Sequence, residues 1–196
     1  MIEINLLYID DKIDPSISEF LDNYKAKNEN INVNYDEIEF DCAYGYEKLV
    51  KDKKVRSGNV ILIDSQLFEN SKAVNGKYTG EDFKLILKKV FPYIEVIVIT
   101  QNPITSEFAS TIPKYSQDMH ESADDYYNKL SELVDIAIRN VCEYREIMNG
   151  LEYEDDKTCI IENIRDSLDG EDCYDGLKKA DIDNIIKEFK RIQEMI

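Results

Sequence analysis

The sequence is poor in basic residues and in long apolar runs. It holds 24 Lys and Arg against 41 Asp and Glu, which gives a formal net charge of -17. Long-range repulsion therefore disfavours binding to nucleic acid or to an anionic membrane. No apolar run approaches the roughly 20 residues that a membrane-spanning helix needs, and no basic leader precedes the first apolar run. We expect a cytoplasmic protein without a membrane or nucleic-acid partner.

Histidine and cysteine are also scarce. The chain has one His, and its four cysteines (Cys42, Cys142, Cys159 and Cys173) show no CxxC or Cys/His spacing. This pattern excludes a conventional zinc site, and we interpret the cysteines as reduced thiols.

Short apolar runs predict a sheet. Three of them, Ile4–Ile9, Val60–Ile63 and Ile94–Ile99, lack polar alternation and indicate strands that are buried on both faces. The alternating run Asn30–Phe40 predicts an edge strand, and Ile112–Tyr115 predicts a short final strand. We therefore expect five strands.

Helical segments separate these strands. A helix is predicted to begin at Pro15, and further helices are predicted over Tyr44–Lys54 and Glu81–Phe91. Gln101–Thr111 holds too few large apolar residues for a packed helix, so the fourth helix is reduced to a loop. The succession predicts an α/β fold, a doubly wound parallel five-stranded sheet.

The sequence predicts helices in the C-terminal part of the chain, from Ser122 onward. Ser122 is predicted to cap a long helix that ends near Gly150, and two more amphipathic segments follow. We divide the chain into an α/β body (1–122), a long last helix that completes it (123–150) and a helical tail for dimerisation or partner binding (151–196).

Polar residues close the buried strands. Asp10 and Asp11 follow the first, Asp64 follows Val60–Ile63, and Thr100 follows Ile94–Ile99. Each acid alone would be read as a cap or turn former. Together they indicate a site, because the carboxyl ends of parallel strands form the ligand crevice of such sheets. Three carboxylates and a hydroxyl there could hold a divalent cation beside a nucleophile.

These residues carry a resemblance to a known family. The order Leu-Leu-Tyr-Ile-Asp10-Asp11, Ile-Leu-Ile-Asp64, Thr79-Gly80-Glu81-Asp82-Phe83, Val-Ile-Val-Ile-Thr100 and Ile-Pro-Lys114 resembles the receiver domain of two-component response regulators. The resemblance covers roughly residues 1 to 150. It implies a flavodoxin-like fold, Mg²⁺ bound by Asp10, Asp11 and Asp64, and a phosphoryl group accepted on Asp64.

The same resemblance suggests the remaining members of the site. The main-chain carbonyl of Gln66 would join the Mg²⁺ ligands, Thr100 would donate its hydroxyl to a phosphoryl oxygen, and a lysine would neutralise another oxygen. We favour Lys114 for this role. Lys129 is the alternative, although the Ser122 cap places it inside a helix.

Three functions fit the sequence. The first is a receiver-like signalling domain that takes a phosphoryl group from a histidine kinase or another signalling protein and signals through its helical tail, with a homodimer through the C-terminal helices as a further expectation. The second is a pseudo-receiver, a protein-interaction module that is not phosphorylated. The third, an Mg²⁺-dependent α/β phosphohydrolase, ranks last because Asp64-Ser65-Gln66 lacks a second Asp. We expect a phosphoacceptor or binding domain, at most self-phosphorylating from small donors, rather than an enzyme.

Overall fold

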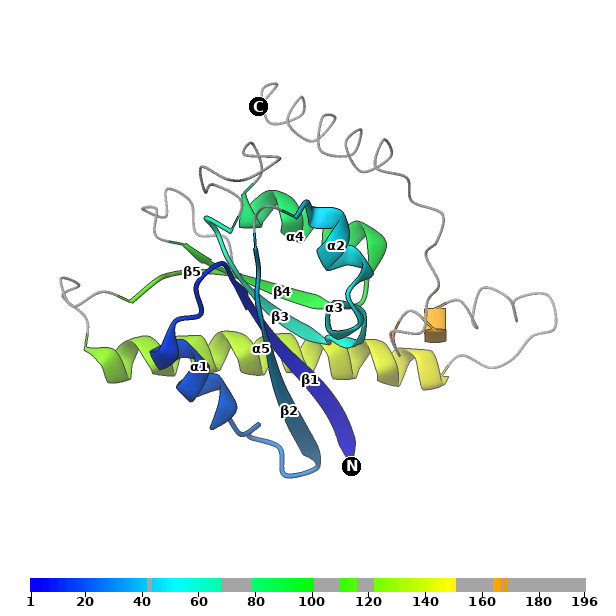
Figure 1. Ribbon diagram of the computed structural model, residues 1–196. Coiled ribbons are helices and arrows are strands. Elements are labelled where there is room, and N and C mark those ends of the chain that lie inside the picture. Colours follow the sequence, from blue (N-terminus) through cyan, green and yellow to red (C-terminus); the bar gives the residue numbers. More distant parts are fainter. Residues whose placement is uncertain are drawn as a thin grey trace, which may run out of the picture.

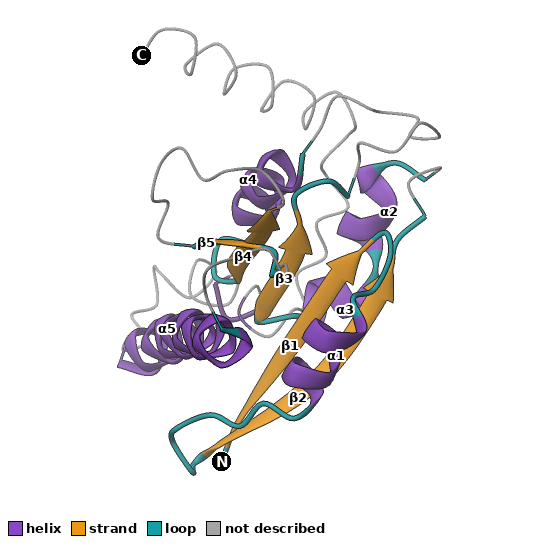
Figure 2. Cartoon of the chain, turned by 90° about the vertical axis from the view of Figure 1, so that its left-hand side faces the viewer, coloured by secondary structure: helices purple, strands orange, loops and turns teal. Residues whose placement is uncertain are grey.

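The strands form one parallel sheet. The computed structural model describes residues 1–41, 44–67, 79–100, 110–115, 122–150, 164–166 and 168. Within this part of the chain the sheet has five strands in the order β2-β1-β3-β4-β5, which confirms the predicted doubly wound, flavodoxin-like arrangement (Figure 2). The strands are β1 (Ile2–Asp10), β2 (Ile31–Glu39), β3 (Val60–Asp64), β4 (Glu95–Thr100) and β5 (Thr111–Pro113).

Helices cover both faces of the sheet. The long helix α5 runs along one side, and α2 and α4 lie on the other (Figure 1). None of the helices in the described ranges is long and apolar enough to cross a membrane. The helices are α1 (Pro15–Asp22), α2 (Tyr46–Lys51), α3 (Lys53–Ser57), α4 (Gly80–Val90) and α5 (Ala123–Gly150).

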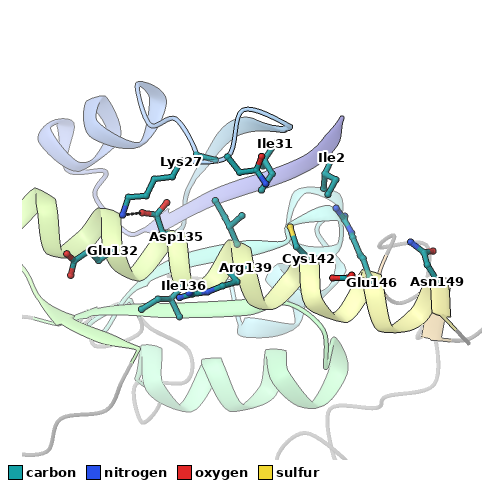
Figure 3. Close-up of a pocket in the computed structure, with 14 residues that line it drawn as sticks. Ile2, Lys27, Ile31, Glu132, Asp135, Ile136, Arg139, Cys142, Glu146 and Asn149 are labelled. Carbon is teal, nitrogen blue, oxygen red and sulfur yellow. Dashed lines mark ion pairs between the residues drawn. The ribbon is translucent and has the colours of Figure 1, made fainter.

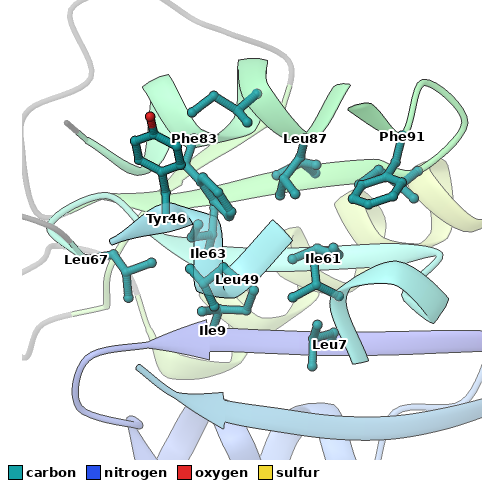
Figure 4. Close-up of a cluster of buried hydrophobic side chains, with 14 of the residues drawn as sticks. Leu7, Ile9, Tyr46, Leu49, Ile61, Ile63, Leu67, Phe83, Leu87 and Phe91 are labelled. Carbon is teal, nitrogen blue, oxygen red and sulfur yellow. The ribbon is translucent and has the colours of Figure 1, made fainter. Parts of the chain in front are cut away.

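The alternation of side chains along each strand builds two cores. On one face, Leu7 and Ile9 of β1 and their neighbours in β3 pack against α4 and α2, with Phe83 and Leu87 of α4 fully buried (Figure 4). Both faces of β1, β3 and β4 are covered, which explains why the apolar runs in these strands lack polar alternation.

The other core lies between the sheet, α1 and α5. Ile4, Leu6 and Tyr8 of β1 pack there against Ile17 of α1 and Leu130 of α5. The first two-thirds of α5 therefore belong to the sheet core. At the end of the helix, Met148 packs instead with Leu168 and Ile164 from the described part of the tail, and with Tyr93 and Tyr144.

The helix predicted over Tyr44–Lys54 is divided in the structure into two short helices, α2 and α3, so its continuity was predicted wrongly. They meet at Asp52, whose backbone is extended (ψ 134°) and whose carboxylate accepts a hydrogen bond from the Lys54 N–H at 2.8 Å. An Asp that caps a new helix competes locally with continuation of the old one, and here the cap forms.

The other element predictions agree with the described structure. β2 is an edge strand, β5 is short and ends at Pro113, and the long helix extends to Gly150. The segment between β3 and α4 is described only at 65–67 and 79. The predicted loop at Gln101–Thr111 is described only from Ser110 onward, and most of the tail lies outside the described residues.

Candidate functional site

The parallel register brings the strand-end acids together. The last paired residues of β1 and β3 are Ile9 and Ile63, so Asp10 and Asp64 follow side by side. One oxygen from each of Asp10, Asp11 and Asp64 lies within 4.8 Å of the other two. Asp10 and Asp64 are buried and Asp11 is half-buried. The predicted convergence of the three acids is confirmed, and their spacing suits shared ligation of one cation.

Lys114 reaches two of these acids. Its Nζ lies 3.1 Å from Asp10 Oδ2 and 3.8 Å from Asp64 Oδ1. Its main-chain N–H donates to the Thr100 carbonyl at 2.6 Å, which anchors the residue beside the end of β4. Burial alone would lower the pKa of Lys114, but the charge of Asp10, the hydrogen bond to it and the charge of Asp64 outweigh burial and raise that pKa. The alternative lysine, Lys129, is exposed on α5.

Asp10 is held by several donors. The buried Tyr8 hydroxyl and the Lys114 ammonium both donate to Asp10 Oδ2, and the Lys12 N–H donates to Oδ1 at 3.1 Å. Burial, and then the hydrogen bond to Asp10, raises the pKa of Tyr8 well above its usual range. The Tyr8 hydroxyl therefore stays protonated and remains a donor.

Asp64 is held much less firmly. Its Oδ2 accepts the Gln66 N–H at 2.8 Å, whereas its Oδ1 is buried and has no hydrogen-bond donor among the described residues. Burial, and after it the negative charge of Asp10, raises the pKa of Asp64 to about 6, although Lys114 and the Gln66 N–H act in the opposite direction. A buried carboxylate with one oxygen that lacks a donor is a costly arrangement, and the positive charge of a cation bound nearby would lower that cost.

The start of α4 is fixed to the end of β3. The Gly80 N–H donates to the Ser65 carbonyl at 2.8 Å, and a Cβ at Gly80 would lie 2.4 Å from the Asp64 carbonyl oxygen. The Ser65 hydroxyl lies 2.8 Å and 2.9 Å from the two carboxylate oxygens of Glu81. A capping box between Thr79 and Asp82 completes the helix start. These contacts position the backbone on which Asp64 sits.

Thr100 and Gln66 lie at or just after the ends of two neighbouring strands, β4 and β3. Thr100 is buried at the end of β4, next to the Ile99 carbonyl that accepts the Ser65 N–H at 2.8 Å. Gln66 follows Asp64 by two residues and holds it through its main-chain N–H. The phosphoryl contact of the Thr100 hydroxyl and the metal contact of the Gln66 carbonyl stay predictions.

Sequence reasoning missed two residues that donate to Asp10, Tyr8 and Lys12, and the Ser65–Glu81 contact beside Asp64. Only Tyr8 carries a usable signal. It is an aromatic residue in an aliphatic strand, two positions before Asp10, and the two-residue period of a strand puts both side chains on the same face.

A groove of about 930 Å³ lies at the opposite end of the sheet. Its lining includes Ile2 and Ile31, which begin β1 and β2, and Ile136 and Cys142 of α5 (Figure 3). Since Asp10 ends β1, this groove is separate from the acidic site.

The comparisons with known proteins give no match to this chain, whether to a family model, to a curated protein or to a solved structure. The fold and the site therefore define the chain as a parallel α/β protein with a buried group of acids that could bind a metal ion.

Proposed function

We propose that this chain is a receiver-like signalling domain that accepts a phosphoryl group on Asp64 in the presence of Mg²⁺. The observation that carries the proposal is the state of Asp64. The residue is 2% exposed, and its Oδ1 has no hydrogen-bond donor in the described structure. That oxygen is 3.8 Å from the Lys114 ammonium, in the group formed with Asp10 and Asp11. It is the oxygen best placed to act as a nucleophile.

The donor set suits Mg²⁺. This ion prefers hard oxygen ligands, and in phosphoryl-transfer sites it takes one or two carboxylates, waters and substrate oxygens. Asp10, Asp11 and Asp64 would hold it, with the Gln66 carbonyl as a further ligand. The single positive charge of Lys114 does not balance three carboxylates, and a divalent cation would supply further positive charge. When bound, Mg²⁺ supplies the charge that lets an anionic nucleophile approach an anionic phosphoryl donor.

The reaction would be a simple displacement. Asp64 Oδ1 attacks the phosphorus atom, an O–P bond forms, and the P–O or P–N bond of the donor breaks, with the electron pair leaving on the donor group. The product on the protein is an acyl phosphate. Lys114 keeps its proton and offers positive charge to the phosphoryl oxygens, and the Thr100 hydroxyl donates a hydrogen bond.

The signal would pass by protein contacts. A histidine kinase or another signalling protein would supply the phosphoryl group, and the helical tail would contact the output partner. The packing of Ile164 and Leu168 against Met148 supports a physical link between tail and body through α5.

Labelling with acetyl phosphate tests the proposal. With Mg²⁺ present, intact-protein mass spectrometry should find one added phosphoryl group that hydroxylamine removes, since hydroxylamine cleaves acyl phosphates. Asp64→Asn should abolish labelling, because the amide has nearly the same shape but is not a nucleophile.

Ser65→Ala is the matched control. It removes the hydroxyl next to Asp64 and should still be labelled, which excludes phosphorylation of the serine. If the wild type stays unlabelled with acetyl phosphate and with phosphoramidate, the phosphoacceptor proposal fails. The alternative, a protein-interaction module that is not phosphorylated, then explains the fold better, with the Lys114–Asp10 ion pair as a structural contact.

A further inference from the structure

Tyr8 places a hydroxyl group inside the apolar core between the sheet, α1 and α5. Its side chain is 0% exposed and lies among the aliphatic and aromatic side chains that join the sheet to α1 and α5. Its hydroxyl donates to Asp10 Oδ2. A hydroxyl placed here contacts a predicted metal ligand from the core side.

The donors to Asp10 differ in how firmly they are placed. Lys12 donates through its main chain to Oδ1, and Tyr8 and Lys114 share Oδ2. Lys114 stands on a flexible four-carbon stem, is 17% exposed and also faces Asp64. In the proposed reaction it turns toward the phosphoryl group. Tyr8 has a rigid ring packed in the core, so it remains on Oδ2 when Lys114 moves.

We propose that Tyr8 is a positioning residue for the cation site, holding the Asp10 carboxylate in the orientation that binds Mg²⁺ before and after phosphorylation. This inference rests on the proposed function, because it takes Asp10 as a metal ligand. Hydrogen bonds from neighbouring groups fix the orientation of metal ligands, and their loss typically lowers metal affinity by about 10- to 100-fold.

Tyr8→Phe is a direct test, because it removes the hydroxyl and keeps the ring. Tyr24→Phe is a matched control. The Tyr24 hydroxyl donates to Asp135 Oδ1 at 2.6 Å, so it also joins a tyrosine to a carboxylate, but at the groove remote from the acids. Both variants lose one hydrogen bond of the same kind. Calorimetric titration with MgCl₂ alone should show an Mg²⁺ Kd about 10- to 100-fold higher in Tyr8→Phe and unchanged in Tyr24→Phe.

A second measurement separates positioning from general weakening of the fold. The initial rate of acetyl phosphate labelling is followed against Mg²⁺ concentration in the full-length chain. Tyr8→Phe should need more Mg²⁺ for half the maximal rate while it reaches nearly the wild-type rate at saturation, because Asp64 and Lys114 are untouched. If the Tyr8 hydroxyl had only a structural role, Tyr8→Phe would lose stability, as Tyr24→Phe would. The Mg²⁺ concentration needed for half the maximal labelling rate would then be the same as in the wild type.

The outcomes distinguish this inference from the function on which it rests. A wild type that binds no Mg²⁺ refutes the proposed function, and this inference with it. A wild type that binds Mg²⁺, together with a Tyr8→Phe variant of unchanged Mg²⁺ affinity, refutes the role of Tyr8 alone. A Tyr8→Phe variant that does not fold also refutes it, since the hydroxyl would then be needed for structure.

Discussion

Replacing Asp64 with asparagine should stabilise the metal-free protein at neutral pH. Burial, and after it the charge of Asp10, raises the pKa of Asp64 from 3.8 to about 6. The folded state therefore binds this proton more tightly than the unfolded chain does, and ionisation of Asp64 favours unfolding. Asparagine keeps the shape of the side chain and has no charge to desolvate.

The size of the effect follows from the two pKa values. The difference between 3.8 and about 6 corresponds to at most about 3 kcal/mol, at about 1.36 kcal/mol for each pH unit. Asp11 is half-buried, so water reaches part of the site and screens the charges. We therefore expect Asp64→Asn to raise the free energy of unfolding by about 1–2 kcal/mol, and Tm by about 2–8 °C.

The gain should depend on pH in a defined direction. Below pH 3.8 Asp64 is protonated in both states of the wild type, so the variant and the wild type should be equally stable at this position. The gain grows as the pH rises and is complete above about 6, where Asp64 is ionised in both states. Mg²⁺ should reduce it, because the cation stabilises the wild type more than the variant.

Urea unfolding with EDTA, followed by circular dichroism at several pH values, measures this gain. Asp36→Asn is a suitable control, since Asp36 makes an exposed ion pair with Lys54 at 2.7 Å, and its loss should cost only about 0–1 kcal/mol. An Asp64→Asn protein that is less stable than the wild type above pH 6, or a gain that does not change with pH, would refute the assignment of Asp64 as a destabilised buried acid.

Three further predictions concern the surroundings of the site. Lys114→Gln should lower the free energy of unfolding of the metal-free protein by about 3 kcal/mol, because it leaves Asp10 and Asp64 without their counter-charge. The control Lys129→Gln should change it by less than about 0.5 kcal/mol. Equal effects of the two substitutions in urea unfolding would contradict this prediction. Gly80→Ala should cost about 1–3 kcal/mol because its Cβ would lie 2.4 Å from the Asp64 carbonyl oxygen, while Gly150→Ala, with nothing within 4 Å, should be nearly neutral. Deleting residues 151–196 should leave a folded body that acetyl phosphate still labels. The Tm of this body should be lower than that of the full chain, because Met148 loses its contact with Leu168. A truncated chain that does not fold would show that the tail is part of the core.

Buried parallel strands can be predicted from the sequence because burial on both faces imposes an unbroken apolar run. Ile4–Ile9 and Val60–Ile63 are such runs, and the parallel register then brings the residues after them together without any further information. The three acids of the site follow from this pattern alone. Helix boundaries depend on weaker local preferences, and the break at Asp52 shows how a single cap overrides a continuous amphipathic pattern.

Contacts made across long stretches of chain could not be predicted in the same way. Lys114 reaches Asp10 over 104 residues, and its place depends on how a three-residue strand, β5, pairs with β4. A short strand carries little periodic signal, so the sequence favours Lys114 but keeps Lys129 as an alternative. In the described structure Lys114 is the one of the two that has ion pairs with Asp10 and Asp64.

The two neighbouring acids Asp10 and Asp64 differ in how many hydrogen bonds their carboxylates accept, and this difference connects the fold to the proposed chemistry. Among the described residues, Asp10 receives donors from Tyr8, Lys12 and Lys114, whereas Asp64 receives one, from the Gln66 N–H. A carboxylate whose oxygens accept several hydrogen bonds is held in one orientation, whereas one with an unsatisfied buried oxygen is energetically costly and has an oxygen free to make a new bond. Because β1 and β3 end side by side, the sheet sets a firmly held acid beside one with an unsatisfied oxygen. Such a pair suits the proposed site, in which both carboxylates would help to hold a cation and the less firmly held one would accept a phosphoryl group.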